Sequence, residues 1–170
     1  YFAEKGIRFV QLGINPWHTV QDIHLQMPKS RYRAMDHYFS RISEYGQRMM
    51  RQTCTIQVNL DFGPDAETLA KRYRVSQLLA PIAAATFAYS AFVDRRPAGV
   101  KTFRSKIWRH ADPSHTGLPG FVGDAAHPPA LSRDVIIDEY FQFLLSADVV
   151  FVADLDYEVP PKGFTFAQWI

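Results

Sequence analysis

Polar and apolar residues alternate strictly along one ten-residue segment, 53–62, which is the clearest element that the chain predicts. One side carries Cys54, Ile56, Val58, Leu60 and Phe62, and the other carries Thr53, Thr55, Gln57, Asn59 and Asp61. A period of two is typical of a β-strand with one buried face. A less regular alternation predicts a strand over 7–14, and the short apolar run 149–152 predicts a buried strand.

Apolar residues at three- and four-residue spacing predict helices over 31–42 and 134–145. Ser30 is the expected N-cap of the first helix, because its hydroxyl can accept a hydrogen bond from a free backbone N–H. The acidic start of the second suits the positive end of the helix dipole. A turn at 162–163 should precede another helix, which begins at Phe164.

A long helix is expected from Ala66, with Asp65 as its cap. Its second half is so apolar that we expect it to be buried, with Pro81 either kinking it or starting a second helix. The pattern over 101–108 leaves helix and strand open. Residues 110–133 are rich in proline and glycine and predict an irregular loop. No linker divides the chain, so we expect a single α+β unit.

The composition excludes several classes of protein. The chain has 170 residues, of which 47% are hydrophobic, and a formal charge of +2. These values are those of a globular domain, and neither a nucleic-acid surface nor a membrane span is indicated. The six histidines show no zinc spacing, so no metal ligand is predicted within the chain. A single cysteine, Cys54, fits a reducing compartment, and we expect a cytoplasmic location.

The polar side of the predicted strand 53–62 is the strongest candidate for a functional surface. It presents hydroxyls, carboxamides and a carboxylate, all on short side chains that lose little rotamer freedom on binding. Such a row suits the floor of a site for a small polar ligand. The alternative is an outer strand with one solvated face, which antiparallel sheets commonly have.

Two further groups of residues are candidates for binding anions. Arg104 can bind a carboxylate through two parallel hydrogen bonds, and Trp108 lies one helical turn further if the segment is helical. Lys29 and Arg31 stand at the expected start of a helix, where phosphate can bind. The alternatives are a surface arginine beside a core tryptophan, and an ordinary capped helix with solvated basic residues.

Three segments taken together resemble the glutamate–cysteine ligase family of plants and many bacteria. Their sequences are MPKSRY (27–32), MMRQTCTIQVNLDF (49–62) and FRSKIWRHADPSHTG (103–117). Residues 71–90 are similar to a helix of the same family. The order and spacing agree over about residues 15–150, and the ordered set is far more specific than any one motif.

The resemblance implies an antiparallel sheet with flanking helices, part of a catalytic domain similar to glutamine synthetase. It implies an ATP-dependent ligase that performs the first step of glutathione biosynthesis. The γ-carboxylate of glutamate would form a γ-glutamyl phosphate, from which the amine of cysteine would displace phosphate. ATP and Mg²⁺ are the expected cofactors. Glutamate, cysteine and ATP are the expected partners, without nucleic acid or membrane, and a homo-oligomer is left open.

Individual residues also receive roles from the resemblance, although no catalytic residue is assigned. Arg104 matches the arginine that holds the α-carboxylate of glutamate. The full set of implied substrate-binding residues is Arg104, Trp108, Thr53, Thr55, Gln57 and Asn59. The residues with an implied ATP or phosphate role are Lys29 and Arg31.

The chain also departs from the family pattern. His115 stands where the family usually has arginine in Asp-x-x-Arg-Thr-Gly. The acidic magnesium ligands of the family are expected on strands before Tyr1. We therefore expect 1–170 to be a single unit that is an incomplete section of a larger ligase domain, inactive alone and with apolar sheet surface exposed. The alternatives are a related carboxylate–amine ligase with another amine acceptor, and an inactive binding or assembly module.

Overall fold

Helices make up most of the regular structure in the computed structural model, which describes residues 1–117, 119 and 132–170. The helices are α1 (Ser30–Ile42), α2 (Glu44–Gln52), α3 (Ala66–Thr86), α4 (Phe103–Ala111), α5 (Pro113–Thr116), α6 (Arg133–Ser146) and α7 (Phe166–Trp169), with 3₁₀ turns η1 (Ala3–Lys5) and η3 (Ala153–Leu155). The strands β1 (Phe92–Val93) and β2 (Arg96–Pro97) form a two-stranded antiparallel hairpin. This combination is an α+β architecture, as predicted.

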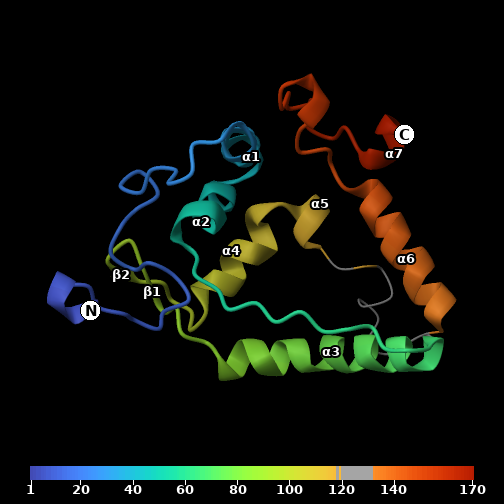
Figure 1. The fold of residues 1–170 in the computed structure, drawn as a ribbon, viewed down its shortest axis with the longest axis horizontal. Coiled ribbons are helices and arrows are strands. Elements are labelled where there is room, and N and C mark those ends of the chain that lie inside the picture. Colours follow the sequence, from blue (N-terminus) through green and yellow to red (C-terminus); the bar gives the residue numbers. More distant parts are fainter. Residues whose placement is uncertain (118, 120–131) are drawn as a thin grey trace.

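Two groups of packed helices organise the described residues (Figure 1). In one group α1 packs on α2 and α2 packs on α4. In the other, α6 packs on α3 and also on α7. Figure 1 shows the long helix α3 running back beneath the extended segment that leads out of α2. α6 rises from the end at which α3 begins.

The apolar core lies between α2, α4 and the hairpin. Ile14, Phe103 and Ile107 are buried at its centre, and Ile107 is fully shielded from solvent. Around them pack the partly buried side chains of Tyr45, Met49, Val93 and Ala98. Phe103 and Ile107 lie one turn apart on α4, so burying this face turns the opposite face of the helix outward.

A polar network beside this core joins three parts of the chain at Gln52. Its side chain is 1% exposed and donates from Nε2 to the carbonyl of His18 at 2.6 Å and to Oδ1 of Asp94 at 3.0 Å. Arg48 donates to Gln52 Oε1 at 2.8 Å and to both carboxylate oxygens of Asp94 at 3.1 and 2.7 Å. Paired hydrogen bonds between arginine and a carboxylate are among the stronger polar contacts in proteins.

The hairpin turn holds Asp94 in position for this network. Asp94 and Arg95 have φ angles of 49° and 64°, the left-handed conformation that a two-residue type I′ turn requires. Aspartate tolerates this region better than most residues with a side chain. The turn therefore presents the Asp94 carboxylate to Arg48 and Gln52.

The helices agree well with their predictions. α1 and α6 match the predicted 31–42 and 134–145, and Asp65 caps α3 by accepting a hydrogen bond from Thr68 N at 2.7 Å. Residues 101–108, which the pattern left open, contribute to α4. The N-cap of α1 is Lys29 instead of Ser30, and no side chain caps this end.

Several details of the helices differ from the predictions. α3 is continuous through Pro81, and none of its residues is buried, so the prediction of a buried second half is wrong. The last helix begins at Phe166, two residues after the predicted start, although the turn before it is present with Gly163 at φ 85°. Within the predicted loop 110–133, residues 113–116 form α5, while 118 and 120–131 lie outside the described residues.

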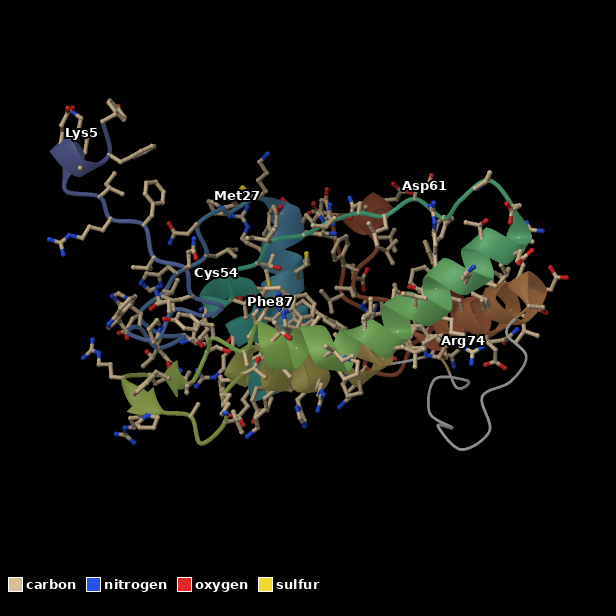
Figure 2. All side chains as sticks on the ribbon, turned by 90° about the horizontal axis from the view of Figure 1, so that it is seen from below. Lys5, Met27, Cys54, Asp61, Arg74 and Phe87 are labelled. Atoms are coloured by element: carbon tan, nitrogen blue, oxygen red, sulfur yellow. The ribbon has the colours of Figure 1, made fainter. Side chains whose placement is uncertain are left out.

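The predicted strand 53–62 does not form as a paired strand. Only its first residues pair, through a bridge between Ile14 and Thr53 and a hydrogen bond from Cys54 N to the carbonyl of Gly13 at 3.1 Å. The rest is extended, with Ile56 94% exposed. Figure 2 shows the segment between Cys54 and Asp61 with no second strand beside it in the part of the chain that is described. A strand needs a hydrogen-bonding neighbour, and alternation alone does not supply one.

The other two strand predictions are wrong for the same reason. Residues 7–14 pair only at Ile14, and the side chains of Phe9 and Val10 are exposed. Residues 149–152 make a single bridge, from Val152 to Glu158. Among the described residues, no helix combines the length and apolarity needed to cross a membrane.

Replacing Asp94 with alanine should destabilise the fold by about 2–4 kcal/mol, because Arg48 and Gln52 lose their shared partner. Asp94→Asn is the matched control, since asparagine also tolerates the left-handed turn and removes only the charge. We expect it to cost about half as much. Urea unfolding followed by circular dichroism measures both, and equal stability of the wild type and Asp94→Ala would contradict a structural role for this network.

Candidate functional site

Arg104 and Trp108 lie one turn apart on α4, on the face next to the buried Phe103 and Ile107. Thr102 caps this helix, with its hydroxyl accepting from Ser105 N at 3.4 Å. The guanidinium carbon of Arg104 is 5.7 Å from the centre of the Trp108 ring, within the range of a cation–π interaction. Trp108 is 38% exposed, so the pair is accessible to a ligand. The spacing indicated this arrangement on condition that the segment is helical, and the segment forms α4.

The extended segment after α2 meets Arg104. Arg104 donates from Nε to the carbonyl of Cys54 at 3.1 Å, and its backbone N–H donates to Ser90 Oγ at 3.1 Å. Gly13 lies against the same side chain, and a Cβ added there would stand 3.3 Å from Arg104 Cδ. The arginine is therefore positioned by three segments that are distant in sequence.

The terminal nitrogens of Arg104 remain available for a ligand. Within the described part of the chain, Nη1 and Nη2 make no hydrogen bond or ion pair; only Nε is engaged. Arg48 and Arg51 differ, because both form paired hydrogen bonds with aspartates. A guanidinium whose outer edge is open and whose plane lies near an indole is suited to bind a carboxylate through two parallel hydrogen bonds.

The polar residues predicted to line the site follow one another along the extended segment that begins after α2. Thr53 is half-buried and donates its hydroxyl proton to the carbonyl of Met49 at 2.6 Å, which anchors it to the end of α2. Thr55, Gln57 and Asn59 are exposed. The Gln57 amide donates to Asn59 Oδ1 at 3.3 Å, so these two side chains share one side of the segment, as the alternation indicated.

Lys29 and Arg31 occupy a different part of the molecule. Both lie at the start of α1 and are exposed, and α2 lies between α1 and α4 (Figure 1). Neither side chain has a hydrogen bond or ion pair with any other described residue. They are accessible to an anion, but the described contacts do not join them to Arg104.

The sequence analysis missed a buried carboxylate at the end of α4. Asp112 is 2% exposed and accepts hydrogen bonds from Ser114 N at 3.0 Å and Ser114 Oγ at 2.7 Å. The phenol of Tyr38 donates to Oδ2 at 2.8 Å, and His115 Nδ1 lies 2.7 Å from the same oxygen. Asp112 thus joins α1 to α5, and the Asp-Pro pair that starts α5 was the available signal.

These contacts determine the ionisation of the cluster. Burial opposes the charge on Asp112, but hydrogen bonds from His115, Ser114 and Tyr38 outweigh it and hold the pKa of this carboxyl well below its usual range. Burial, together with the hydrogen bond to Asp112, raises the pKa of Tyr38. The phenol therefore stays protonated as a donor while the carboxylate stays charged. His115, which departs from the family's arginine, serves here as a partner of Asp112.

No magnesium ligand is assigned among the described residues. Among them, no three His, Cys, Asp or Glu side chains lie close enough together to hold a metal ion. Mg²⁺ prefers several oxygen ligands in near-octahedral geometry, and neither Arg104 nor Trp108 supplies one. The donor set around α4 suits an anionic organic ligand instead.

A family profile described as glutamate-cysteine ligase family 2 (GCS2) matches residues 1–135. The chain belongs to the glutamate–cysteine ligase family. This confirms the resemblance drawn from the three motifs, two of which supply the residues that meet at Arg104.

Curated relatives agree with the family assignment. The chain is 36% identical to glutamate–cysteine ligase, chloroplastic, of Medicago truncatula, over 98% of the chain and 31% of the relative. It is 35% identical to the chloroplastic ligase of Arabidopsis thaliana, over 98% of the chain and 30% of the relative. It is 40% identical to ligase B, chloroplastic, of Oryza sativa subsp. japonica, over 98% of the chain and 32% of the relative. The chain thus spans about a third of the length of these ligases.

The expected cytoplasmic location is contradicted by these comparisons. The three ligases described above are each named chloroplastic, which points to the plastid. The prediction failed because the low cysteine content on which it rested indicates reducing conditions and does not identify a compartment.

Asp112→Asn should lower the free energy of unfolding at pH 7 by about 2–4 kcal/mol, because an amide cannot accept every donor that surrounds the carboxylate. The wild type should also lose stability in acid. The folded pKa lies below that of an unfolded aspartate, so this contribution is complete above about pH 4 and declines as the pH falls toward the folded pKa.

Urea unfolding at pH 7 and pH 3 measures both effects. Asp138→Asn, at an exposed position on α6, is the control and should leave stability unchanged at pH 7. A variant at Asp112 with the stability and the acid sensitivity of the wild type would show that the carboxylate carries no such role.

Proposed function

We propose that the protein is an ATP-dependent ligase that joins the γ-carboxylate of glutamate to the amine of cysteine. Family membership supports this activity. One structural observation supports a substrate-binding site at Arg104. Arg104 is held by the Cys54 carbonyl through Nε, while its two terminal nitrogens make no hydrogen bond or ion pair with the other described residues and can bind a carboxylate. The relatives' names support a plastid location as part of the same proposal.

In this proposal Arg104 binds the α-carboxylate of glutamate and leaves the γ-carboxylate free to react. Trp108 restricts the guanidinium to one orientation through the cation–π contact. The polar side chains of Thr55, Gln57 and Asn59 offer further hydrogen bonds to the substrate along the extended segment. Correct orientation of two reactants is itself a large part of the rate enhancement in such a reaction.

The proposed chemistry proceeds in two transfers. An oxygen of the γ-carboxylate attacks the terminal phosphorus of ATP, and ADP leaves with the electrons of the broken P–O bond. The nitrogen of cysteine then attacks the acyl carbon, phosphate departs, and the nitrogen loses a proton, which gives γ-glutamylcysteine. Lys29 and Arg31 are proposed to bind phosphate groups, since both cations are exposed and unpaired among the described residues. Mg²⁺ is part of the proposal without ligands among those residues.

The same proposal accounts for the exposed apolar face of residues 54–62. We infer that these residues form one strand of a larger antiparallel sheet, similar to that of glutamine synthetase, and that the chain is one section of that ligase domain. The support is the alternation itself, together with Ile56 at 94% and Leu60 at 77% exposure. An exposed apolar strand with unpaired backbone groups is otherwise a strong aggregation hazard.

Arg104→Ala should weaken glutamate binding by about 2–5 kcal/mol, because a carboxylate loses its charged partner. The glutamate concentration needed for half-maximal rate should rise accordingly. Arg104→Lys should recover only part of this, because an ammonium lacks the two parallel donors and the Nε bond to Cys54. ADP release by the longer ligase that contains these residues, measured against glutamate concentration with cysteine and ATP saturating, tests both variants.

Arg109→Ala is the matched control, since Arg109 is an exposed arginine on the same helix and should leave the kinetics unchanged. Unchanged kinetics in Arg104→Ala would overturn the assigned role. A panel of acceptor amines in the same assay separates glutamate–cysteine ligation from a related ligase, and ADP release that does not depend on any amine would refute ligation altogether.

A further inference from the structure

A cleft that Arg104 does not line lies between α1 and residues 156–159 and has a volume of about 490 Å³. Its α1 wall includes Arg33, Ala34 and His37, and its opposite wall includes Asp156, Tyr157 and Val159. Figure 1 shows the chain around η3 beside α1. The volume lies within the usual range for sites that bind small molecules.

The α1 wall is basic above a small apolar floor. Arg33 and His37 lie four residues apart and so occupy one face of the helix, with the buried Ala34 between them. The guanidinium of Arg33 has no hydrogen bond or ion pair with another described side chain. All donors of this side chain are therefore available to a ligand in the cleft or to solvent. Arg48 and Arg51 on the neighbouring helix α2 differ, because both pair with aspartates.

The opposite wall is acidic and held by a constrained turn. Asp156 and Tyr157 have φ angles of 50° and 61°, in the left-handed region that residues with side chains seldom occupy. The Tyr157 ring packs against Phe151 with centroids 5.3 Å apart, and a hydrogen bond from Val152 N to the carbonyl of Glu158 closes the turn. The Asp156 carboxylate makes no ion pair with any described residue.

Opposite charges therefore face one cleft without neutralising each other. Arg33 and Asp156 both line it, yet no ion pair joins them. A ligand with only a negative charge would meet Asp156, and one with only a positive charge would meet Arg33. A small molecule that carries both charges satisfies both walls, because its carboxylate can bind the guanidinium and its ammonium can bind the aspartate.

We propose that this cleft binds a small zwitterion of the free α-amino acid type, with the carboxylate at Arg33 and the ammonium at Asp156. His37 adds a hydrogen-bond donor on the basic wall, and Tyr157 and Val159 offer contact to an aliphatic side chain. The cleft uses none of the residues assigned to glutamate or phosphate, so the inference does not depend on the proposed ligase activity.

Isothermal titration calorimetry with chosen probes tests the assignment. L-Leucine and glycine carry both charges, 4-methylpentanoate has the leucine skeleton with only the carboxylate, and 3-methylbutylamine has only the ammonium. L-Leucine should bind at least about tenfold more tightly than either single-charge analogue. No binding of either amino acid at about 10 mM, or equal binding of leucine and 4-methylpentanoate, would overturn the proposal.

Matched variants locate the binding. Arg33→Gln and Asp156→Asn should each weaken leucine binding about tenfold, and asparagine keeps the left-handed turn. Arg41→Gln, on the same face of α1 but outside the cleft, should have no effect, and neither should Arg104→Ala. Binding that survives both cleft variants but is lost in Arg104→Ala would place the amino acid at the α4 site and refute the cleft. Melting curves followed by circular dichroism confirm that each variant is folded.

Discussion

The path of the chain around the α4 site depends on one buried amide, that of Gln52. Its side chain forms hydrogen bonds with an arginine, an aspartate and a backbone carbonyl. The main-chain carbonyl of Gln52 accepts a further hydrogen bond from Asn15 N at 2.8 Å. A buried amide without partners is costly, so other exits from α2 are strongly disfavoured. The N-terminal segment, the hairpin and the start of the extended segment are thereby fixed together. The face of α4 that carries Arg104 takes its position from that junction.

Local features of the sequence were enough to predict α1, α3 and α6, but they gave no prediction for α2 and left α4 open between helix and strand. Asp65 caps α3 through its own side chain, and the four-residue spacing of Arg104 and Trp108 places them together once α4 forms. These interactions lie within a few residues, where propensity and spacing carry the information. The segment 53–62 shows the limit of such reasoning. Its alternation correctly predicted that Gln57 and Asn59 lie on one side. A β-strand also needs a hydrogen-bonded neighbouring strand, which periodicity cannot identify.

Contacts between distant parts of the chain account for what the sequence did not reveal. The sequence assigned no role to Asp94, and its role arises from a left-handed turn that faces Arg48. Asp112 becomes a buried acceptor only when α1 brings Tyr38 beside it. The family resemblance implied a binding role for Arg104, but it did not indicate that the Cys54 carbonyl orients this side chain. In each case the partners come from separate elements, so no single window of sequence contains the interaction.

The bond between Arg104 and position 54 has a consequence for how this site tolerates change. The acceptor is a main-chain oxygen, which every amino acid supplies, so substitutions at Cys54 leave the acceptor in place. The backbone N–H of Cys54 also donates to the carbonyl of Gly13, so the same residue is held through both of its neighbouring peptide groups. The arginine is therefore insensitive to the identity of residue 54 and sensitive to chain length. Inserting or deleting one residue between Gln52 and Thr55 would shift the carbonyl by about 3.3 Å along the chain direction and turn it to the other side. The guanidinium of Arg104 would then lose the acceptor that orients it.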